Sequence, residues 1–192
     1  MVTIEKRVEE IFSLFEKYGD SDYIGESISQ LEHAVQGAQL AEEEGYSDEV
    51  IIAALLHDIG HLCDQDGKYE NMGTFGRADH EKIGGDYLRK LGFPELVTFL
   101  VENHVQAKRY LTFRNPRYFE TLSEASLQTL GYQGGPMNVE EAASFEADPN
   151  FQASLEMRTW DELAKKENFP VPDLTRYKEM CSRILESTAT SH

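Results

Sequence analysis

Cysteine is scarce in this chain: only Cys63 and Cys181 occur among 192 residues. Neither lies in a C-x-x-C arrangement, which excludes the thiolate-rich structural zinc sites. Two cysteines are also too few for a disulfide framework, so we expect both to be reduced thiols. A metal site in this chain is therefore expected to use imidazole and carboxylate ligands.

Basic residues are also few, with 18 Lys and Arg against 35 Asp and Glu and a formal net charge of −17. They are scattered among the acids, whereas nucleic-acid binding needs a clustered basic face that neutralises phosphates. We therefore expect no nucleic-acid partner. This charge does not exclude the binding of one small anion in a local basic pocket.

Long apolar runs are absent too, since none approaches the roughly 20 residues that span a bilayer. The first ten residues are too highly charged for a signal peptide. These features predict a soluble, cytoplasmic protein with no membrane partner.

No segment shows the alternation of β-branched residues that marks a strand, and apolar residues recur at helical spacing instead. The sequence therefore predicts an all-α protein. Because 192 residues suit one compact core and no linker or repeat is present, we expect a single domain over residues 1–192, with the Ser/Thr-rich tail after Glu186 frayed.

The expected helices cover residues 3–17, 28–41, 49–59, 78–91, 95–110, 118–132, 139–145, 151–166 and 173–185. The helix at 49–59 is apolar on nearly all sides and is therefore expected at the centre of the fold. Residues 62–77 are glycine-rich and polar, which is typical of a loop that is either a lid over a site or a plain connection.

Five of the six histidines lie between residues 33 and 104. A lone histidine is more often a hydrogen-bonding core or surface residue than a ligand. However, His57, His80 and His104 recur at intervals of 23 and 24 residues, and each interval matches one antiparallel return from helix to helix. This pattern indicates that they converge.

Asp58 follows His57 directly, at the polar end of an apolar run. The two oxygens of a carboxylate can each take one ion and hold a pair about 3.5–4 Å apart. Together with His33 and Asp161, these residues form a mixed imidazole and carboxylate set that suits iron, manganese or zinc. We therefore expect Asp58 to bridge a two-metal centre.

The order His33, His57-Asp58 and a distal Asp161 resembles the HD-domain superfamily, which has an all-α fold, and His80 and His104 resemble its two-metal branch. Within that branch the chain is similar to the mixed-valent di-iron oxygenases, the group that contains myo-inositol oxygenase and the phosphonate-cleaving enzymes of the PhnZ and TmpB type. The motifs that carry the similarity to the phosphonate group extend over nearly the whole chain: Asp22-Tyr23-Ile24-Gly25-Glu26, Gln30-Leu31-Glu32-His33, Ala53-Ala54-Leu55-Leu56-His57-Asp58, His80-Glu81-Lys82, Asn103-His104-Val105, Ala107-Lys108-Arg109-Tyr110-Leu111, Tyr132-Gln133-Gly134-Gly135-Pro136-Met137 and Trp160-Asp161-Glu162.

The resemblance implies two iron ions, as an Fe(II)/Fe(III) pair, with O2 as co-substrate. It implies that one iron is held by His33, His57, Asp58 and Asp161, and the other by Asp58, His80 and His104. Tyr23 resembles the tyrosine that occupies the second iron's open position at rest, and Glu26 resembles the carboxylate that recognises the cationic end of the substrate. Judged on the residues alone, Tyr23 and Glu26 would be capping and core residues.

Three further side chains are expected to project beside ligands, because His61 lies four residues after His57, Lys108 four after His104, and Arg158 three before Asp161. Ser126 and Thr129, three apart on one expected helix, can add hydroxyl donors. Cations and hydroxyls close to a metal suit a phosphonate, and these five residues resemble the phosphonate-binding positions of the family. An isolated Lys108 or Arg158 would instead be read as a surface charge paired with an acid.

We therefore expect a dioxygenase of phosphonate catabolism. It would cleave the carbon–phosphorus bond of a small zwitterionic substrate, 1-hydroxy-2-aminoethylphosphonate or its N-trimethyl analogue, and release phosphate with glycine or glycine betaine. One alternative is a metal-dependent HD phosphohydrolase acting on a small phosphate ester, and another is a metal-stabilised regulatory module without turnover. Tyr23, Glu26 and the lack of a nucleotide-sized basic groove favour the oxygenase.

Overall fold

The computed structural model describes residues 2–23, 25–63 and 79–190, so the expected loop at 62–77 lies outside the described residues from position 64 onward. Within these ranges the chain forms helices and no strand, apart from one isolated antiparallel bridge between Asp22 and Ser29. The prediction of an all-α protein is confirmed. The helices are α1 (Ile4–Tyr18), α2 (Gln30–Glu43), α3 (Asp48–Leu56), α4 (Gly60–Cys63), α5 (His80–Leu91), α6 (Glu95–Arg114), α7 (Pro116–Thr121), α8 (Glu124–Tyr132), α9 (Val139–Glu146), α10 (Phe151–Leu163) and α11 (Thr175–Thr190).

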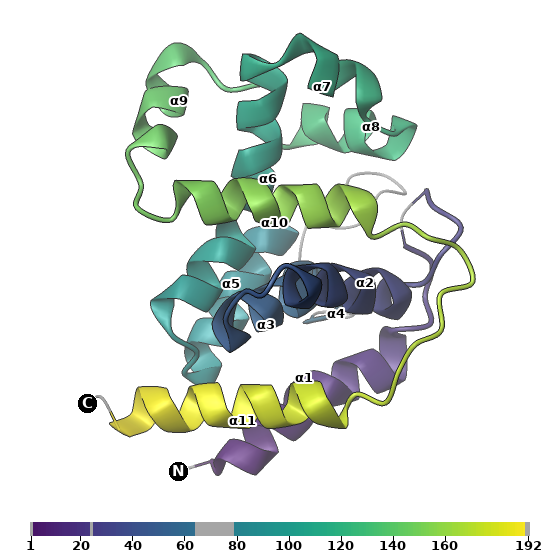
Figure 1. The fold of residues 1–192 in the computed structure, drawn as a ribbon, viewed down its shortest axis with the longest axis vertical. Coiled ribbons are helices and arrows are strands. Elements are labelled where there is room, and N and C mark those ends of the chain that lie inside the picture. Colours follow the sequence, from purple (N-terminus) through teal and green to yellow (C-terminus); the bar gives the residue numbers. More distant parts are fainter. Residues whose placement is uncertain (1, 24, 64–78, 191–192) are drawn as a thin grey trace.

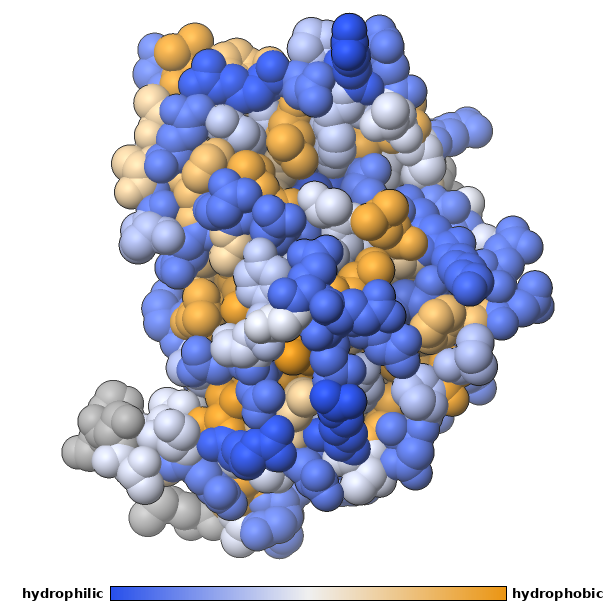
Figure 2. Space-filling model, viewed as in Figure 1, coloured by the Kyte–Doolittle hydropathy of each residue, from blue (hydrophilic) through white to orange (hydrophobic). Residues whose placement is uncertain are grey.

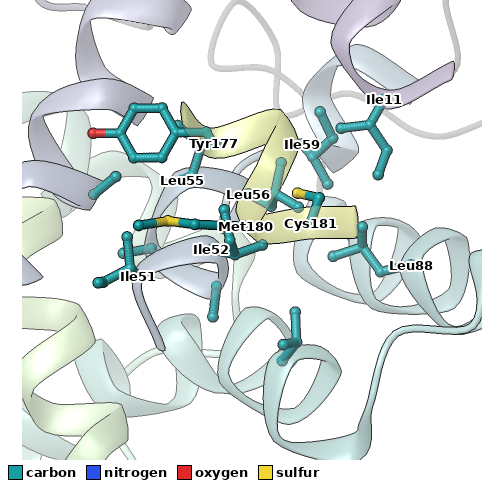
Figure 3. Packing of buried hydrophobic residues seen from close by; sticks show 14 of the residues in the cluster. Ile11, Ile51, Ile52, Leu55, Leu56, Ile59, Leu88, Tyr177, Met180 and Cys181 are labelled. Carbon is teal, nitrogen blue, oxygen red and sulfur yellow. The ribbon is translucent and has the colours of Figure 1, made fainter. Parts of the chain in front are cut away.

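Helix α3 lies at the centre of the fold, as its apolar sequence predicts. Every residue from Val50 to Leu56 is buried, and α3 packs against α2, α6, α10 and α11. Figure 3 shows how α11 closes this core, with Tyr177, Met180 and Cys181 next to the α3 side chains. Burial of this much apolar surface is the main favourable term in folding, and it fixes the end of α3 that carries His57.

The other helices lie on either side of this centre. Helices α1 and α11 cross at one end of the molecule, near both termini, and α7, α8 and α9 form the opposite end (Figure 1). Helix α6 runs toward the end formed by α7, α8 and α9, and α10 crosses it in the middle of the molecule (Figure 1). Their contact matters for the site, because α6 carries His104 and Lys108 while α10 carries Arg158 and Asp161.

Several predicted helix boundaries differ from the structure: α6 continues to Arg114 rather than ending at residue 110, α10 ends at Leu163 rather than at residue 166, and three further differences follow. The segment expected as one helix at 118–132 is split into α7 and α8, because Leu122 and Ser123 are extended and the Ser123 hydroxyl accepts a hydrogen bond from Ser126 N at 3.3 Å, which starts a new helix. The central helix ends at Leu56 rather than Ile59, and His57–Ile59 form a turn.

The third difference is at the C-terminus. We expected fraying after Glu186, whereas α11 continues to Thr190. The hydroxyls of Thr188 and Thr190 donate to carbonyls within the same helix, at 2.9 Å each, so these polar side chains are satisfied without leaving the helix.

The surface seen in Figure 2 is mainly hydrophilic, with hydrophobic residues in small separate groups. None of the helices in the described ranges combines the length and the apolar character needed to cross a membrane.

Candidate metal centre and substrate pocket

All six predicted ligands converge on one buried site. They come from five places in the fold: His33 from α2, His57 and Asp58 from the end of α3, His80 from the first turn of α5, His104 from α6, and Asp161 from α10. The four histidines and Asp161 are at most 4% exposed. The packing of α2 against α10 brings His33 and Asp161, the first and last ligands in the sequence, to the same site.

The turn after α3 is what allows the helices to meet. Gly60 begins α4 so close to the start of α5 that a Cβ atom there would lie 1.9 Å from the carbonyl oxygen of His80. Only glycine fits such an approach. Asp58 and His80 are thereby brought together, with Asp58 Oδ1 at 3.2 Å from His80 Nε2.

The two oxygens of Asp58 face two different histidine pairs. Asp58 Oδ2 lies 3.7 Å from His33 Nε2 and 3.4 Å from His57 Nε2. Asp58 Oδ1 faces the other pair, at 3.2 Å from His80 Nε2 and 3.4 Å from His104 Nε2. Asp161 joins the first pair, with its Oδ1 at 3.4 Å from His33 Nε2. This is the arrangement expected of a carboxylate between two ions.

The histidine tautomers test whether a metal fits. The Nδ1 atoms of His33, His57 and His104 each lie 2.7–2.9 Å from a backbone carbonyl, to which they donate. In the neutral rings their Nε2 atoms then carry lone pairs, and the Nε2 atoms lie close together in two pairs, with 3.1 Å between His33 and His57 and 3.0 Å between His80 and His104. Nitrogens at this distance need a proton or a metal cation between or beside them. Metal-binding histidines have the same hydrogen bond from the second nitrogen, so the residues fit a metal.

The electrostatics of the site also favour bound cations. Burial alone would raise the pKa of Asp58, but the surrounding histidines, His57 first, lower it well below its ordinary value. Burial would likewise raise the pKa of Asp161, and Arg158 lowers it instead. Burial alone would lower the pKa of His57, but the two carboxylates raise it well above the ordinary value. The carboxylates thus stay ionised and attract positive charge between the histidines.

We expect metal loading to stabilise the protein. An ion at 100 times its dissociation constant adds about 2.7 kcal/mol to the free energy of unfolding. For a chain of this length that corresponds to a rise in Tm of roughly 5–11 °C. Differential scanning calorimetry of the metal-free protein with added Fe²⁺ or Zn²⁺ measures it. Ca²⁺, which prefers oxygen ligands, is the matched control and should give no comparable rise. An unchanged Tm with both transition metals would contradict the site.

A pocket that is open to solvent adjoins the Asp58 side of the cluster. All the predicted substrate-binding residues line it, namely Glu26, His61, Lys108, Ser126, Thr129 and Arg158, together with Tyr23 and the ligands Asp58, His80, His104 and Asp161. The structure therefore brings the expected substrate residues and the expected ligands to one pocket.

Lys108 is suited to bind an anion. Its side chain is only 4% exposed, and its Nζ donates to Thr129 Oγ1 at 3.0 Å. Within the described ranges it forms no ion pair. Burial, and after it repulsion from Arg158, lower the pKa of Lys108 to about 7. A buried ammonium of this kind gains a great deal from a negatively charged ligand.

Arg158 has a different environment from the one expected. Its guanidinium donates to Tyr118 Oη at 2.7 Å and forms ion pairs with Asp161 and Glu162, while Ser126 Oγ lies 3.5 Å away on the pocket side. Most of its donors are thus engaged with the protein. Arg158 holds Asp161 Oδ2, which leaves Asp161 Oδ1 facing His33.

Tyr23 and Glu26 lie in one tight turn between α1 and α2. Glu26 N donates to Tyr23 O at 2.9 Å, and Gly25 has φ +75°, a left-handed conformation that suits glycine. The Tyr23 ring stacks on His33 at 3.8 Å between centroids, and its hydroxyl donates to Asp161 Oδ1 at 3.3 Å. The structure therefore places the Tyr23 hydroxyl on a ligand assigned to the first ion.

His61 lies close to two of the predicted metal ligands, Asp58 and His80. Its ring stacks on His80, with 4.1 Å between centroids, and one of its nitrogens lies within 4.8 Å of donor atoms of Asp58 and His80. It lines the pocket on that side. A bound substrate that reaches Asp58 and His80 would therefore contact His61 as well.

Two polar residues of the pocket were missed by sequence reasoning. Gln133 follows α8, and its buried Oε1 has no hydrogen-bond partner among the described residues. Lys165 follows α10 and pairs with Glu26 at 2.9 Å. Gln133 belongs to the Tyr132–Met137 motif, one of those that carry the resemblance to the phosphonate-cleaving group, so its place in the pocket could have been expected from the sequence. Lys165 was expected on the helix at 151–166, but α10 ends at Leu163, and its partner Glu26 is far away in the sequence, so no pattern marked Lys165 as a pocket residue.

Comparisons with known proteins agree with this geometry. A family model described as "HD domain" matches residues 25–148. The [1-hydroxy-2-(trimethylamino)ethyl]phosphonate dioxygenase (glycine-betaine-forming) of Leisingera caerulea is 41% identical over 179 residues, which cover 93% of this chain and 90% of that protein. The hydroxymethylphosphonate dioxygenase of Gimesia maris is 40% identical over 181 residues, 94% of this chain and 89% of that protein. Uncharacterized protein L432 of Acanthamoeba polyphaga mimivirus is 44% identical over 189 residues, 98% and 86% of the respective chains.

Proposed function

Because the chain belongs to the HD-domain family, in its phosphonate-cleaving oxygenase branch, we propose that it is a di-iron dioxygenase of organophosphonate catabolism. The proposed substrate is 1-hydroxy-2-aminoethylphosphonate or its N-trimethyl analogue. The products are inorganic phosphate and glycine or glycine betaine. The two iron ions, when bound, supply the redox chemistry that activates O2.

The proposed reaction balances with O2 as the sole oxidant. The C–P bond and the C–H bond on the hydroxyl-bearing carbon break, and one oxygen atom is added to carbon and one to phosphorus. The carbon becomes a carboxylate and the phosphonate becomes phosphate. No external electron donor is required.

The observation that carries this proposal is the position of Lys108 beside a bridging carboxylate. His33, His57, Asp58 and Asp161 would hold one iron, and Asp58, His80 and His104 the other. Lys108, with Thr129, Ser126 and His61, lines the cavity next to the second set, where an anionic phosphonate would bind. Arg158 would add charge from behind Asp161, and Glu26 at the pocket wall would receive the cationic end.

The deciding experiment measures phosphate release by the iron-loaded protein with and without O2. Three phosphonates are compared: the free amine, the trimethylated analogue and hydroxymethylphosphonate, which lacks a cation. We expect O2-dependent release, with O2 consumption equal to phosphate formed. Release of phosphate from a phosphate ester without O2 would support the phosphohydrolase instead.

The pH dependence of kcat/KM tests the role of Lys108. With a pKa of about 7, Lys108 is half protonated at pH 7 and loses its charge as the pH rises. Its contribution to phosphonate binding should then fall about fifteenfold between pH 7 and pH 8.5. Arginine stays charged throughout this range, so the ratio of kcat/KM for wild type to that for Lys108→Arg should fall by the same factor.

Taking this ratio cancels the ionisation of the phosphonate itself, which both proteins share. Lys82→Arg is the control, because Lys82 is 73% exposed on α5 and its ratio to wild type should not vary with pH. A Lys108→Arg ratio that is equally flat would mean that the charge of Lys108 does not contribute to binding.

A further inference from the structure

The ion pair between Lys165 and Glu26 occupies the end of the pocket where the cationic end of the substrate is expected. Lys165 Nζ lies 2.9 Å from Glu26 Oε1, and both residues line the cavity that contains Asp58 and Lys108. Each side chain is about one-fifth exposed (20% and 21%). The pair is therefore partly shielded from water, and a ligand in the pocket can reach it.

The backbone of Lys165 is held firmly to the metal site. Ala164 O accepts the hydrogen bond from His33 Nδ1 at 2.9 Å, and Gln36 bonds both the N–H and the carbonyl of Lys166, at 2.9 and 3.2 Å. His33 and Gln36 are one turn apart on α2. The segment after α10 thus lies along α2, on the side of the molecule where the turn before α2 also runs (Figure 1).

The side chain of Lys165 is held less firmly than its backbone. Besides Glu26, its nearest polar neighbour is Ser123 Oγ at 3.5 Å, which is at the limit of a hydrogen bond. Lysine has a long, flexible stem, so its ammonium can move into solvent while the backbone stays in place. Glu26 is therefore the group that keeps the ammonium in the pocket.

The two other carboxylates that line the pocket have separate partners. Asp161 is paired with Arg158, and Asp58 faces the four histidines. Among the described residues that line the pocket, Glu26 is thus the carboxylate available to a cationic ligand at this end, and Lys165 already neutralises it. A substrate ammonium or trimethylammonium must displace Lys165 from Glu26, whereas a phosphonate without a cation need not.

Building on the proposed function, we infer that Lys165 is an internal counter-ion that competes with the substrate's cation for Glu26, and so sets the preference between amine-bearing and amine-free phosphonates. It acts through Glu26 and is a specificity-determining residue rather than a catalytic one. Removing it leaves Glu26 free and also removes a positive charge that repels the substrate cation.

The test compares Lys165→Met with wild type on the amine-bearing phosphonates and on hydroxymethylphosphonate. For the amine-bearing substrates we expect KM to fall about three- to fivefold, the range of a partly exposed ion pair, with kcat little changed. The KM for hydroxymethylphosphonate should not fall. Dissociation constants of the same ligands, measured by anaerobic calorimetry on the metal-loaded protein, should change in the same way without any turnover.

Three variants separate this role from a structural one. Lys166→Met makes the same charge change at the neighbouring exposed residue, whose side chain forms no hydrogen bond or ion pair within the described ranges, and should alter neither constant. Lys165→Arg keeps the ion pair and should stay near wild type. The double variant Glu26→Gln/Lys165→Met should bind the amine-bearing phosphonates no more tightly than Glu26→Gln does, because no carboxylate is left for Lys165 and the substrate cation to compete for.

The inference is overturned if Lys165→Met does not bind the amine-bearing phosphonates more tightly than wild type does. It is also overturned if the affinity for hydroxymethylphosphonate changes by the same factor. The proposed function fails by a different result, namely no O2-dependent phosphate release from any of the three phosphonates by wild type. Because calorimetry measures ligand preference without O2, the two failures can be told apart.

Discussion

Replacing Asp58 with asparagine is expected to abolish phosphate release, with a loss in kcat of roughly a thousandfold or more. A metal ion contributes several kcal/mol of charge stabilisation, and each 1.4 kcal/mol is a factor of ten in rate. Asparagine keeps the size of the side chain and one carbonyl oxygen. In Asp58 one oxygen faces His33 and His57 and the other faces His80 and His104, all within 3.7 Å. In the asparagine variant the amide nitrogen must take the place of one of these oxygens.

An amide N–H can donate to the Nε2 lone pairs of the histidines that it faces, and it cannot bind a cation. The metal content should therefore fall from two ions per chain to about one, measured by elemental analysis after iron loading under anaerobic conditions. Asp86→Asn is the matched control, because Asp86 is 48% exposed on α5 and pairs only with neighbouring surface cations. Two ions per chain together with wild-type turnover in Asp58→Asn would rule out the bridging role.

The convergence of the ligands could be predicted because their spacing depends on helix geometry. The intervals between His57, His80 and His104 each match one helix and its antiparallel return, which brings the three histidines together. Asp58 can bridge two ions only if these histidines surround it. The end of α5 was likewise predictable: Gly92 has φ +89°, the conformation that ends a helix and favours glycine.

The break between α7 and α8 was not predicted, because the apolar pattern continues across it. It arises from the extended backbone of Leu122 and from the cap that Ser123 provides. A single serine is compatible with the interior of a helix as well as with its start, and packing decides between them. The break matters for the site, since α8 carries both Ser126 and Thr129 to the pocket.

The role of Lys165 could not be predicted for a related reason. The predicted helix continued to residue 166, whereas α10 ends at Leu163, so the direction of the Lys165 side chain depends on the tertiary contacts of its backbone. Those contacts are made by His33 and Gln36. A charge run such as Lys165-Lys166 is ordinarily a solvated surface, and in this fold one of the two lysines faces the pocket while the other is exposed.

Arg158 lies beside Asp161, as predicted. Its surroundings indicate that it stabilises the fold as well as adding charge for the phosphonate. It is 4% exposed and pairs with Asp161, itself buried, and with the partly buried Glu162. Removing one partner of a buried ion pair leaves an uncompensated charge, at a cost of about 3–5 kcal/mol. We therefore expect Arg158→Met to lower the Tm of the metal-free protein by roughly 6–20 °C and to lose activity.

The matched control is Arg183→Met on α11. Arg183 pairs with Asp48 at 2.6 Å, but the two side chains are 55% and 39% exposed, so this pair contributes at most about 1 kcal/mol and the Tm should fall by less than about 4 °C. Calorimetry of both variants gives the comparison. Equal Tm values for Arg158→Met and Arg183→Met would contradict the buried role.

A second variant separates stability from function at this position. In Arg158→Met/Glu162→Gln one of the two unpaired carboxylates is neutralised, so part of the lost Tm should return. Phosphate release should not return, because Asp161 still lacks the cation that holds its Oδ2 away from the histidines. Recovery of activity together with Tm would mean that Arg158 serves only to neutralise Glu162. Recovery of Tm alone would mean that Arg158 does more than neutralise Glu162, either by holding Asp161 or by adding charge for the phosphonate.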